Sequence, residues 1–497
     1  MNLGIDDLRL TMLRIPSDFK IVRIQSIVNR KTSIFNLVWV RVNRLELYMN
    51  QNKLRRLIFI IAIGYLFLQP GWVTAEAIDG PFNLRLTIEA ALKANLELQR
   101  SKDEIDAATA NKNAATTQFF PTLNARYGYI KRDNPTTQAL GTQGGQTVDV
   151  IVNPEDEYNF VTSFSQPIFT GFALYNRYKI AALGLDIAGF SERLTRQNVI
   201  LDAKNAYYLI LKAQKLMEVA DETVKQIAAQ KDVAENMYQV GMSPLNDLLQ
   251  SQVQLANAKQ QLITAKNNLD LSKSQFNTLL RRPINASVSV VDILDYTPWE
   301  HDIDYCLALA EELRLEIQVA ELEVEIAEKD YKLSQRDFFP SVNLTGTWTQ
   351  RGTDWDVDGG EGISDKDFWD IRATATWDFW QWGRTRYGVK EKLSRLSQAK
   401  LRKQELLDNI DLEVKQAYLK TQEAQKNITT IEKAIEQARE NLRITEERYK
   451  EQVSTTTDVL VAQTLLTETM TNYYNALYDF KIAKAILYRA LGQEILE

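Results

Sequence analysis

The feature that most constrains the fold of this chain is an internal duplication. The 497 residues include QFFPTLNARYGY at 118–129 and DFFPSVNLTGTW at 337–348, whose prolines lie 219 positions apart (340 − 121). Further along, DAKNAYYLILKAQ (202–214) matches EVKQAYLKTQEAQ (413–425) at an offset of 211 positions (413 − 202). Solenoid repeats are only about 20–50 residues long, so these copies are too long to be solenoid units. We therefore expect two copies of one domain, each ordered helix–strand–strand–helix–helix.

Long helices dominate each copy. The 68 residues from Phe172 to Gln239 include no Pro, and at about 1.5 Å per residue they form roughly 100 Å of helix. Apolar residues recur there every three or four positions, a spacing typical of coiled-coil packing. Gly241–Asn246 interrupts the pattern, and we expect Ser243 as N-cap and Pro244 as first residue of a returning helix. The second copy is expected to turn at Glu451–Thr457.

Four stretches between the helices alternate apolar with polar residues, as β-strands do: 123–129, 158–165, 342–349 and 369–379. Strands of about ten residues with aromatic ends are typical of membrane barrels, but a soluble antiparallel sheet has the same period. Lipid tolerates no open sheet edge, and a barrel needs at least about eight strands. If these strands cross a membrane, several chains must share one barrel. Between them, 131–157 and 350–367 are expected to be long polar loops.

The N-terminal part has the pattern of a secretory signal peptide. A basic start at Lys53, Arg55 and Arg56 precedes the apolar core Leu57–Leu68, and Val73-Thr74-Ala75 is a cleavage site of small residues. An uncut membrane anchor is the alternative. Met49 is the natural first residue of such a signal. The expected organisation is an over-extended start (1–48), a signal peptide (49–75), a first repeat (76–280), an equatorial linker (281–305) and a second repeat (306–497).

The composition disfavours enzymatic chemistry. The chain has a single Cys, Cys306, and a single His, His301, which leaves no disulfide framework, no His-based triad and no multi-His metal site. No phosphate-cradling Gly loop is present, and we expect no catalytic residues and no cofactor. Without residues 1–75 the chain retains 48 basic (59 − 11) and 61 acidic (65 − 4) residues, a net charge of −13. Such a surface repels nucleic acid.

The segment DWDVDGGEGISD at 354–365 fits the start of a calcium loop. Asp354, Asp356, Asp358 and Gly359 match D-x-D-x-D-G. The twelfth position is Asp365 instead of Glu, and strands rather than helices flank the segment. We therefore favour a solvated acidic loop and predict no metal site.

The chain resembles the TolC family of outer-membrane efflux and secretion ducts over roughly residues 84–493. The resemblance rests on the duplicated halves, the FFP before the first strand of each, QPIFTGF (166–172), WDFWQWGR (377–384) and the two hairpin turns. It implies a mainly α fold with membrane β-strands. In that fold a homotrimer builds a 12-stranded barrel in outer-membrane lipid, and long antiparallel helical hairpins continue it as an α-barrel. A small mixed region at 281–303 would surround its middle.

The function implied by the resemblance is passive conduction. The chain would be the exit duct of a tripartite efflux or type I secretion system. An inner-membrane pump or ABC transporter would drive the substrate, and a periplasmic adaptor (membrane fusion protein) would dock on the helical turns. A soluble periplasmic coiled-coil scaffold or adaptor is the alternative, since it too would need a signal peptide and long helices.

The resemblance also suggests site residues at the hairpin turns. Asp247, Tyr449 and Asp458 match the family pattern of a periplasmic gate, although Asp in the first turn of a helix also simply favours the macrodipole. The adaptor-contact residues would be Gly241, Met242, Ser243, Gln452, Val453 and Ser454. Three positions depart from the family pattern: Gln452 replaces Gly, Ser454 replaces a basic residue and Val461 replaces an acidic one.

Aromatic residues are the last group of candidates. Phe119, Phe120 and Pro121, with Phe338, Phe339 and Pro340, should mark helix-to-strand junctions, because Pro ends a helix and favours extended backbone before it. The Phe pairs suit an apolar–polar boundary, but an ordinary helix–sheet core would also accommodate them. Trp348, Trp369 and Trp377 could form an aromatic girdle at a membrane interface, or lie in a sheet core.

Overall fold

The computed structural model describes residues 81–143, 146–293 and 296–495, which lie in one compact unit, Gly80–Glu497. The expected over-extended start (1–48) and signal peptide (49–75) lie outside the described residues. Within the described ranges, every helix is too short or too polar to cross a lipid bilayer.

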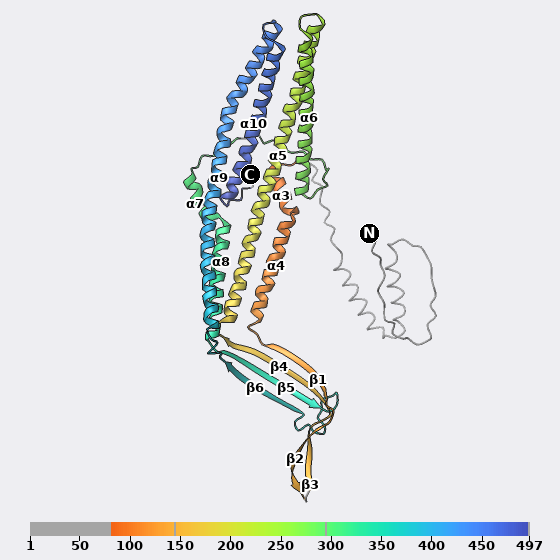
Figure 1. The fold of residues 1–497 in the computed structure, drawn as a ribbon, viewed down its shortest axis with the longest axis vertical. Coiled ribbons are helices and arrows are strands. Elements are labelled where there is room, and N and C mark those ends of the chain that lie inside the picture. Colours follow the sequence, from red (N-terminus) through yellow and green to blue (C-terminus); the bar gives the residue numbers. More distant parts are fainter. Residues whose placement is uncertain (1–80, 144–145, 294–295, 496–497) are drawn as a thin grey trace, which may run out of the picture. The chain divides into compact units, whose positions relative to one another are not determined.

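The two halves of the unit repeat the same order of helices and main-sheet strands, and the first half has the additional hairpin β2–β3 (Figure 1). The elements of the first half are α3 (Leu84–Ala94), α4 (Leu96–Thr117), β1 (Thr122–Lys131), β2 (Thr136–Gln143), β3 (Gln146–Asn153), β4 (Asp156–Thr170), α5 (Ala173–Gln239) and α6 (Leu245–Leu279). Those of the second half are α7 (Ile303–Leu313), α8 (Leu315–Ser334), the 3-10 turn η1 (Arg336–Phe338), β5 (Ser341–Gly352), β6 (Asp367–Thr376), α9 (Arg384–Lys450) and α10 (Thr456–Ala490). Helices α5 and α9 both have 67 residues, and α6 and α10 both have 35.

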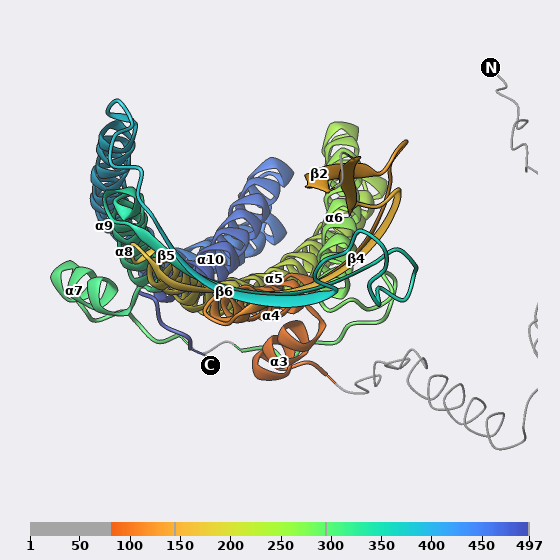
Figure 2. The same ribbon diagram turned by 90° about the horizontal axis from the view of Figure 1, so that it is seen from below.

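The long helices pack as two antiparallel hairpins, α5 with α6 and α9 with α10. Helix α10 also packs on α5, and the shorter α8 lies against both α5 and α9, so the two halves share one helical layer. In Figure 2, α9, α8, α5 and α4 follow one curved layer and the sheet curves in the same sense. Asn83 and Asn95 start α3 and α4 by accepting hydrogen bonds from Leu86 N–H (2.7 Å) and Leu98 N–H (2.9 Å), as N-caps do.

The four predicted strands form one antiparallel sheet in the order β1-β4-β5-β6. Its edges, β1 and β6, have no strand neighbour on their outer sides in this sheet. Two expectations were wrong in detail. The segment 131–157 is not a plain loop, because it includes the hairpin β2–β3, and the described chain therefore has six strands instead of four. Strand β6 ends at Thr376, although the alternation continues to Phe379.

The sheet has one apolar and one polar face. Because facing residues of paired strands lie on the same side, the registers place Tyr127, Phe160, Trp348, Trp369 and Ile371 on one face. Arg126, Ser165, Asn343, Thr345 and Thr374 lie on the other. The apolar face is open to solvent in the single chain: Trp369 is 73% exposed and Ile371 is 61% exposed.

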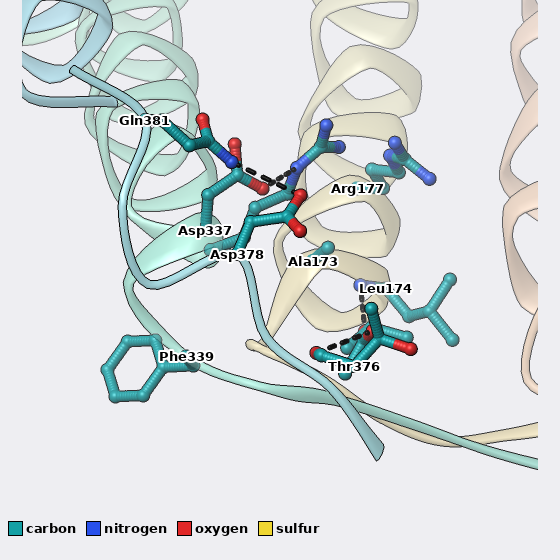
Figure 3. A pocket seen from close by; sticks show the side chains of 11 residues that line it. Ala173, Leu174, Arg177, Asp337, Phe339, Thr376, Asp378 and Gln381 are labelled. Atoms are coloured by element: carbon teal, nitrogen blue, oxygen red, sulfur yellow. Dashed lines mark hydrogen bonds and ion pairs between the residues drawn. The ribbon is translucent and has the colours of Figure 1, made fainter. Parts of the chain in front are cut away.

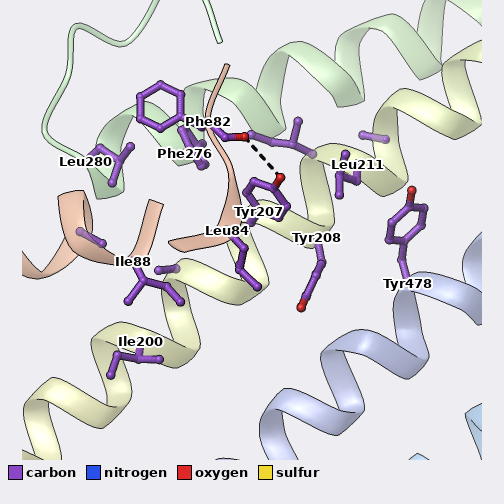
Figure 4. Close-up of a cluster of buried hydrophobic side chains, with 14 of the residues drawn as sticks. Phe82, Leu84, Ile88, Ile200, Tyr207, Tyr208, Leu211, Phe276, Leu280 and Tyr478 are labelled. Atoms are coloured by element: carbon purple, nitrogen blue, oxygen red, sulfur yellow. Dashed lines mark hydrogen bonds between the residues drawn. The ribbon is translucent and has the colours of Figure 1, made fainter. Parts of the chain in front are cut away.

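The main hydrophobic core lies midway along α5, where α3, α5, the C-terminal end of α6 and α10 meet. Phe82, Ile88, Tyr207, Phe276 and Tyr478 are almost completely buried there (Figure 4). The Tyr207 hydroxyl bonds the carbonyls of Phe82 and Val291, and burial raises the pKa of Tyr207 to about 12. The expected mixed region contributes one parallel bridge in its described part, between Val290 and Phe82.

A second packing centre surrounds the buried guanidinium of Arg314, between α7 and α8. It donates to the Ala490 carbonyl (3.0 Å) and to the carboxylates of Glu316 (3.0 Å) and Glu413 (2.9 Å). Burial raises the pKa of Glu316, but Arg314 and Arg489 beside it hold that pKa below its usual value. This network joins α8, α9 and α10.

Candidate functional site: the hairpin turns and the helix–sheet junction

The turns of the two helical hairpins have the same backbone structure. We name them tip one (Val240–Pro244) and tip two (Glu451–Thr455). In tip one, Met242 N–H bonds Met237 C=O at 2.8 Å and Gly241 N–H bonds Tyr238 C=O at 3.0 Å, which is a Schellman motif. Tip two has the same two bonds 211 residues later: Val453 N–H bonds Arg448 C=O, and Gln452 N–H bonds Tyr449 C=O. Both motifs need a left-handed residue, which is Gly241 (φ 74°) in tip one and Gln452 (φ 61°) in tip two.

The start of the return helix after tip one differs from the expectation. Helix α6 begins at Leu245 with Pro244 as its N-cap, and no side chain caps it. The Ser243 hydroxyl is buried without a hydrogen-bond partner among the described residues. The predicted pairing of Ser243 as cap with Pro244 as first helical residue was therefore wrong by one position, because Pro244 takes the extended backbone of a cap (ψ 155°).

Tip two has a complete capping box, and Asp458 belongs to it. The Asp458 carboxylate accepts from the N–H of Thr455 (2.8 Å) and from the hydroxyls of Thr455 (2.8 Å) and Ser454 (3.0 Å). Thr455 in turn accepts from Asp458 N–H at 3.2 Å. These bonds, first the one from the Thr455 backbone, lower the pKa of Asp458. Asp458 is thus an exposed carboxylate that stays ionised while it caps α10.

The two tips are linked to each other within one chain. The buried Thr456 hydroxyl lies 3.2 Å from the Asp247 carboxylate and 2.9 Å from the Tyr449 hydroxyl. Thr456 has one proton to donate, so it donates to Asp247 and accepts from Tyr449. Thr457 donates to Gln250 at 3.1 Å, and the Gln452 amide lies 3.9 Å from the Met242 sulfur.

The structure therefore brings Asp247 and Tyr449 together through Thr456, and leaves Asp458 in its own cap. Thr456, Thr457 and Gln250 were not among the predicted site residues. The run TTT at 455–457 was the available signal, but its partners belong to another hairpin and no local pattern identifies them.

The FFP motifs lie where helices give way to strands. Residues 118–121 connect α4 to β1, and η1 with Phe339 and Pro340 connects α8 to β5. All four Phe side chains are between 41% and 61% exposed, so they do not form an ordinary core. Phe339 packs edge-on against Phe169 (6.4 Å) and Phe172 (5.8 Å), and Phe119 against Tyr178 (6.3 Å).

A polar pocket of about 300 Å³ lies at the same junction (Figure 3). Arg177 of α5, Asp337 and Phe339 before β5, and Asp378 and Gln381 after β6 line it. Gln381 donates to Asp378 at 3.3 Å. Charged groups therefore gather at the level where the helices meet the sheet.

The three tryptophans occupy two levels of the sheet. Trp348 and Trp369 face each other across β5 and β6, and Trp377 follows the other end of β6. Trp369 and Trp377 are eight residues apart, or about 26 Å along an extended strand. This spacing is close to the roughly 25 Å height of a membrane barrel's apolar band.

The acidic segment 354–365 does not gather its carboxylates around one point. Asp358 pairs with Lys366 at 2.8 Å, and its N–H approaches Asp356 at 3.5 Å. Within the described ranges, no group of three or more His, Cys, Asp or Glu side chains is placed to hold a metal ion.

The chain thus combines duplicated long helical hairpins, turns that are linked to each other, and a sheet with one exposed apolar face. The model of the family described as outer membrane efflux protein matches residues 87–280 and 306–493. The chain therefore belongs to this family, known as the TolC family, which is one of transport channels rather than enzymes. Membership places it in the outer membrane, with its helical part in the periplasm.

Individual relatives are distant but cover most of the chain. Nodulation protein T of Rhizobium leguminosarum bv. trifolii is 20% identical over 435 residues, which are 85% of this chain and 88% of the relative. Outer membrane protein TolC of Escherichia coli K12 is 22% identical over 422 residues, 82% of each chain.

Solved structures share the fold. That of the outer membrane protein VceC from Vibrio cholerae has a TM-score of 0.70 at 19% identity, covering 82% of this chain and 96% of that one. That of the CmeC outer membrane channel of Campylobacter jejuni has a TM-score of 0.70 at 16% identity, covering 82% and 85%.

Proposed function

We propose that this chain is the outer-membrane exit duct of a tripartite efflux or type I secretion system. Three copies contribute four strands each to one 12-stranded barrel, and their helical hairpins continue the duct into the periplasm. The duct itself does no chemistry. An inner-membrane pump or ABC transporter supplies the energy, and a periplasmic adaptor connects the two.

One observation supports this proposal above the others: the exposed apolar face of an open sheet. In water, a contiguous surface with Trp369 73% exposed and Leu123 79% exposed would promote aggregation. In lipid the same face is favourable, but the unpaired edges of β1 and β6 are not, because each unsatisfied backbone group costs several kcal/mol there. Closure with other copies removes both edges at once.

The tips are the proposed gate and adaptor contact. Asp247, Thr456 and Tyr449 tie one hairpin to the other, so opening the duct at this end would require these hydrogen bonds to break. Val240, Met242 and Val453 are 57–68% exposed at the turns. These apolar side chains are suited to an adaptor that covers the tips.

The decisive experiment is the native mass of the signal-cleaved protein, extracted from outer membranes in mild detergent. A trimer that needs detergent supports the shared barrel. A monomer or dimer that washes out with the soluble periplasmic fraction would overturn the duct proposal and favour a periplasmic scaffold.

A further inference from the structure

A cavity of about 360 Å³ lies where α5 packs on α10, at a contact between the two halves of the chain. Leu84 of α3 and two residues of the linker between α6 and α7, Ile293 and Thr297, complete its wall. Ile495, which follows α10, also lies in the wall. The proposed duct gives this cavity no role, and all of these residues belong to one chain.

Every charged side chain among the described residues of this wall is a lysine. Lys204 comes from α5, and Lys481 and Lys484 come from α10. Lys204 is only 4% exposed, although its side chain ends in an ammonium group. Burial, and then the neighbouring charge of Lys484, lower the pKa of Lys204 to about 8, and burial also lowers the pKa of Lys484. Three amines therefore gather where water has little access.

Aromatic rings lie beside these amines. The Lys204 Nζ lies 5.9 Å from the ring centroid of Tyr488. The Lys481 Nζ lies 5.9 Å from the ring centroid of Tyr208. The Lys484 Nζ lies 6.0 Å from the Tyr488 ring and donates to a backbone carbonyl of the linker at 3.0 Å. These distances are at the limit of cation–π attraction, about 6 Å. The cavity therefore has positive charge and apolar surface side by side.

A carboxylate on an apolar body fits this arrangement better than other ligands. Three lysines repel a metal ion or an amine. A buried ammonium is costly unless an anion lies beside it, so an anion is favoured. Inorganic phosphate would lose its hydration against Leu84, Ile293 and Phe480, which line the same wall and donate no hydrogen bonds from their side chains. A carboxylate with an apolar body would place its charge at the lysines and its body against these side chains.

We propose that this cavity binds a carboxylate carried by an apolar body, and that the bound carboxylate ties α5 to α10. Two sources have this chemistry. One is the chain itself, because Ile495 lies in the wall and Glu497 follows two positions later, within about 7 Å along an extended backbone. The other is a small organic carboxylate from solution. The proposal goes beyond the duct function and does not rest on it.

Binding of benzoate tests the proposal, and benzamide is the uncharged control molecule of nearly the same shape. Two proteins are compared in detergent by equilibrium dialysis with radiolabelled benzoate. One is the unmodified chain. The other is Glu497→Gln followed by a Gly/Ser extension, which leaves no carboxylate at position 497. Benzoate should bind to at least one of these proteins, and an excess of benzamide should not displace it.

The comparison of the two proteins distinguishes the sources. If the carboxylate comes from solution, both proteins should bind benzoate equally well. If the chain provides it, the Glu497→Gln protein should bind benzoate about tenfold or more tightly than the unmodified chain, because the internal competitor is gone. In that case its Tm should also be lower than that of the unmodified chain, and added benzoate should restore it.

Lysine variants, made in the protein that binds benzoate, test the site itself. Lys204→Met keeps the length of the side chain and removes its charge, and should weaken binding about tenfold or more. Lys484→Met is a second variant with the same expected result, should the first not fold. Lys225→Met is the matched control, because Lys225 lies on the same helix and pairs with Asp221 at 2.9 Å. It should bind as its parent does.

Two results would overturn the proposal. One is that neither protein binds benzoate in preference to benzamide. The other is that Lys204→Met and Lys484→Met both fold and bind benzoate as well as Lys225→Met does. Neither result concerns the duct, whose test is the native mass in detergent.

Discussion

At the scale of single residues, tip two stores backbone strain that tip one avoids. Gln452 takes the left-handed conformation that Gly241 occupies in tip one. A residue with a Cβ pays about 1–2 kcal/mol in this region, whereas Gly pays only in the flexibility of its unfolded chain, about 0.5–1 kcal/mol. The duplication therefore supplies its own comparison, two identical Schellman turns with different residues at the same position.

Exchanging these residues should change the stability of the two turns in opposite directions. Gln452→Gly should stabilise tip two and Gly241→Gln should destabilise tip one, each by the difference of these two costs, about 0.5–1 kcal/mol. Amide hydrogen exchange at the two turns measures both free energies of opening. Faster exchange at tip two of Gln452→Gly would show that the Gln452 contact with Met242 outweighs the strain.

The pH response of tip two should follow Asp458. Its pKa is lowered in the folded state, so its capping contribution is complete above the pKa of an unfolded Asp, about 3.9, and is lost as the pH falls through the folded value. Asp458→Asn should therefore weaken the protection of the first turn of α10 from hydrogen exchange at neutral pH. In this variant, lowering the pH should no longer weaken that protection further.

The same variant tests the proposed gate. If Asp458 forms an acidic constriction, Asp458→Asn should also raise single-channel conductance or weaken block by divalent cations. Glu440→Gln is the matched control, because Glu440 pairs with Arg443 on the surface of α9 and lies outside both tips. Unchanged conductance and unchanged block in Asp458→Asn would leave Asp458 with the capping role alone.

At the scale of elements, the sequence predicted the parts whose signals are local. The duplication, the long helices and all four strands of the main sheet were predicted, because period, Pro positions and self-similarity are all visible in one chain. The hairpin β2–β3 was missed because its strands are embedded in a Gly-, Thr- and Gln-rich segment typical of loops. The link from Thr456 to Asp247 was missed because it joins hairpins that are about 200 residues apart in sequence.

The end of β6 differs from the sequence prediction for another reason. The alternation predicted a strand through Phe379, and the single chain stops pairing at Thr376. A strand needs a partner to satisfy its backbone groups, and the sequence pattern does not say which chain provides it. In the proposed shared barrel, a neighbouring copy would provide such a partner for β6.

The two faces of the sheet should respond differently to the same charge. Ile371 on the apolar face and Thr374 on the polar face lie three residues apart on β6. Ile371→Lys should cost about 2–4 kcal/mol, the cost of a cation on the lipid face near the bilayer midplane, and should lower the amount of protein in outer membranes. Thr374→Lys should have little effect. Equal losses in both variants, measured by immunoblot of outer-membrane fractions, would contradict the assignment of the faces.

At the scale of the whole molecule, the internal duplication would make the proposed trimer nearly sixfold, since each chain contributes two similar halves. The largest departure from this symmetry is the hairpin β2–β3, which has no counterpart between β5 and β6. It pairs with itself and not with the main sheet. The register of β1 and β4 holds from Thr122–Ser165 to Lys131–Asp156 without it.

Replacing Thr136–Asn153 with a short Gly/Ser turn should therefore leave the sheet, the native mass and the conductance unchanged. The ion pair of Arg132 with Glu157 (2.7 Å), at the base of the hairpin, stays in the variant and continues to fix the ends of β1 and β4. Native mass in detergent tests whether the trimer is kept, and conductance in planar bilayers tests whether the duct is unchanged. Both are compared with the unmodified chain. Loss of the trimer would mean that the hairpin makes contacts between copies, which its removal would then remove together with its own pairing. A severalfold rise in conductance with an intact trimer would instead place the hairpin across the mouth of the duct.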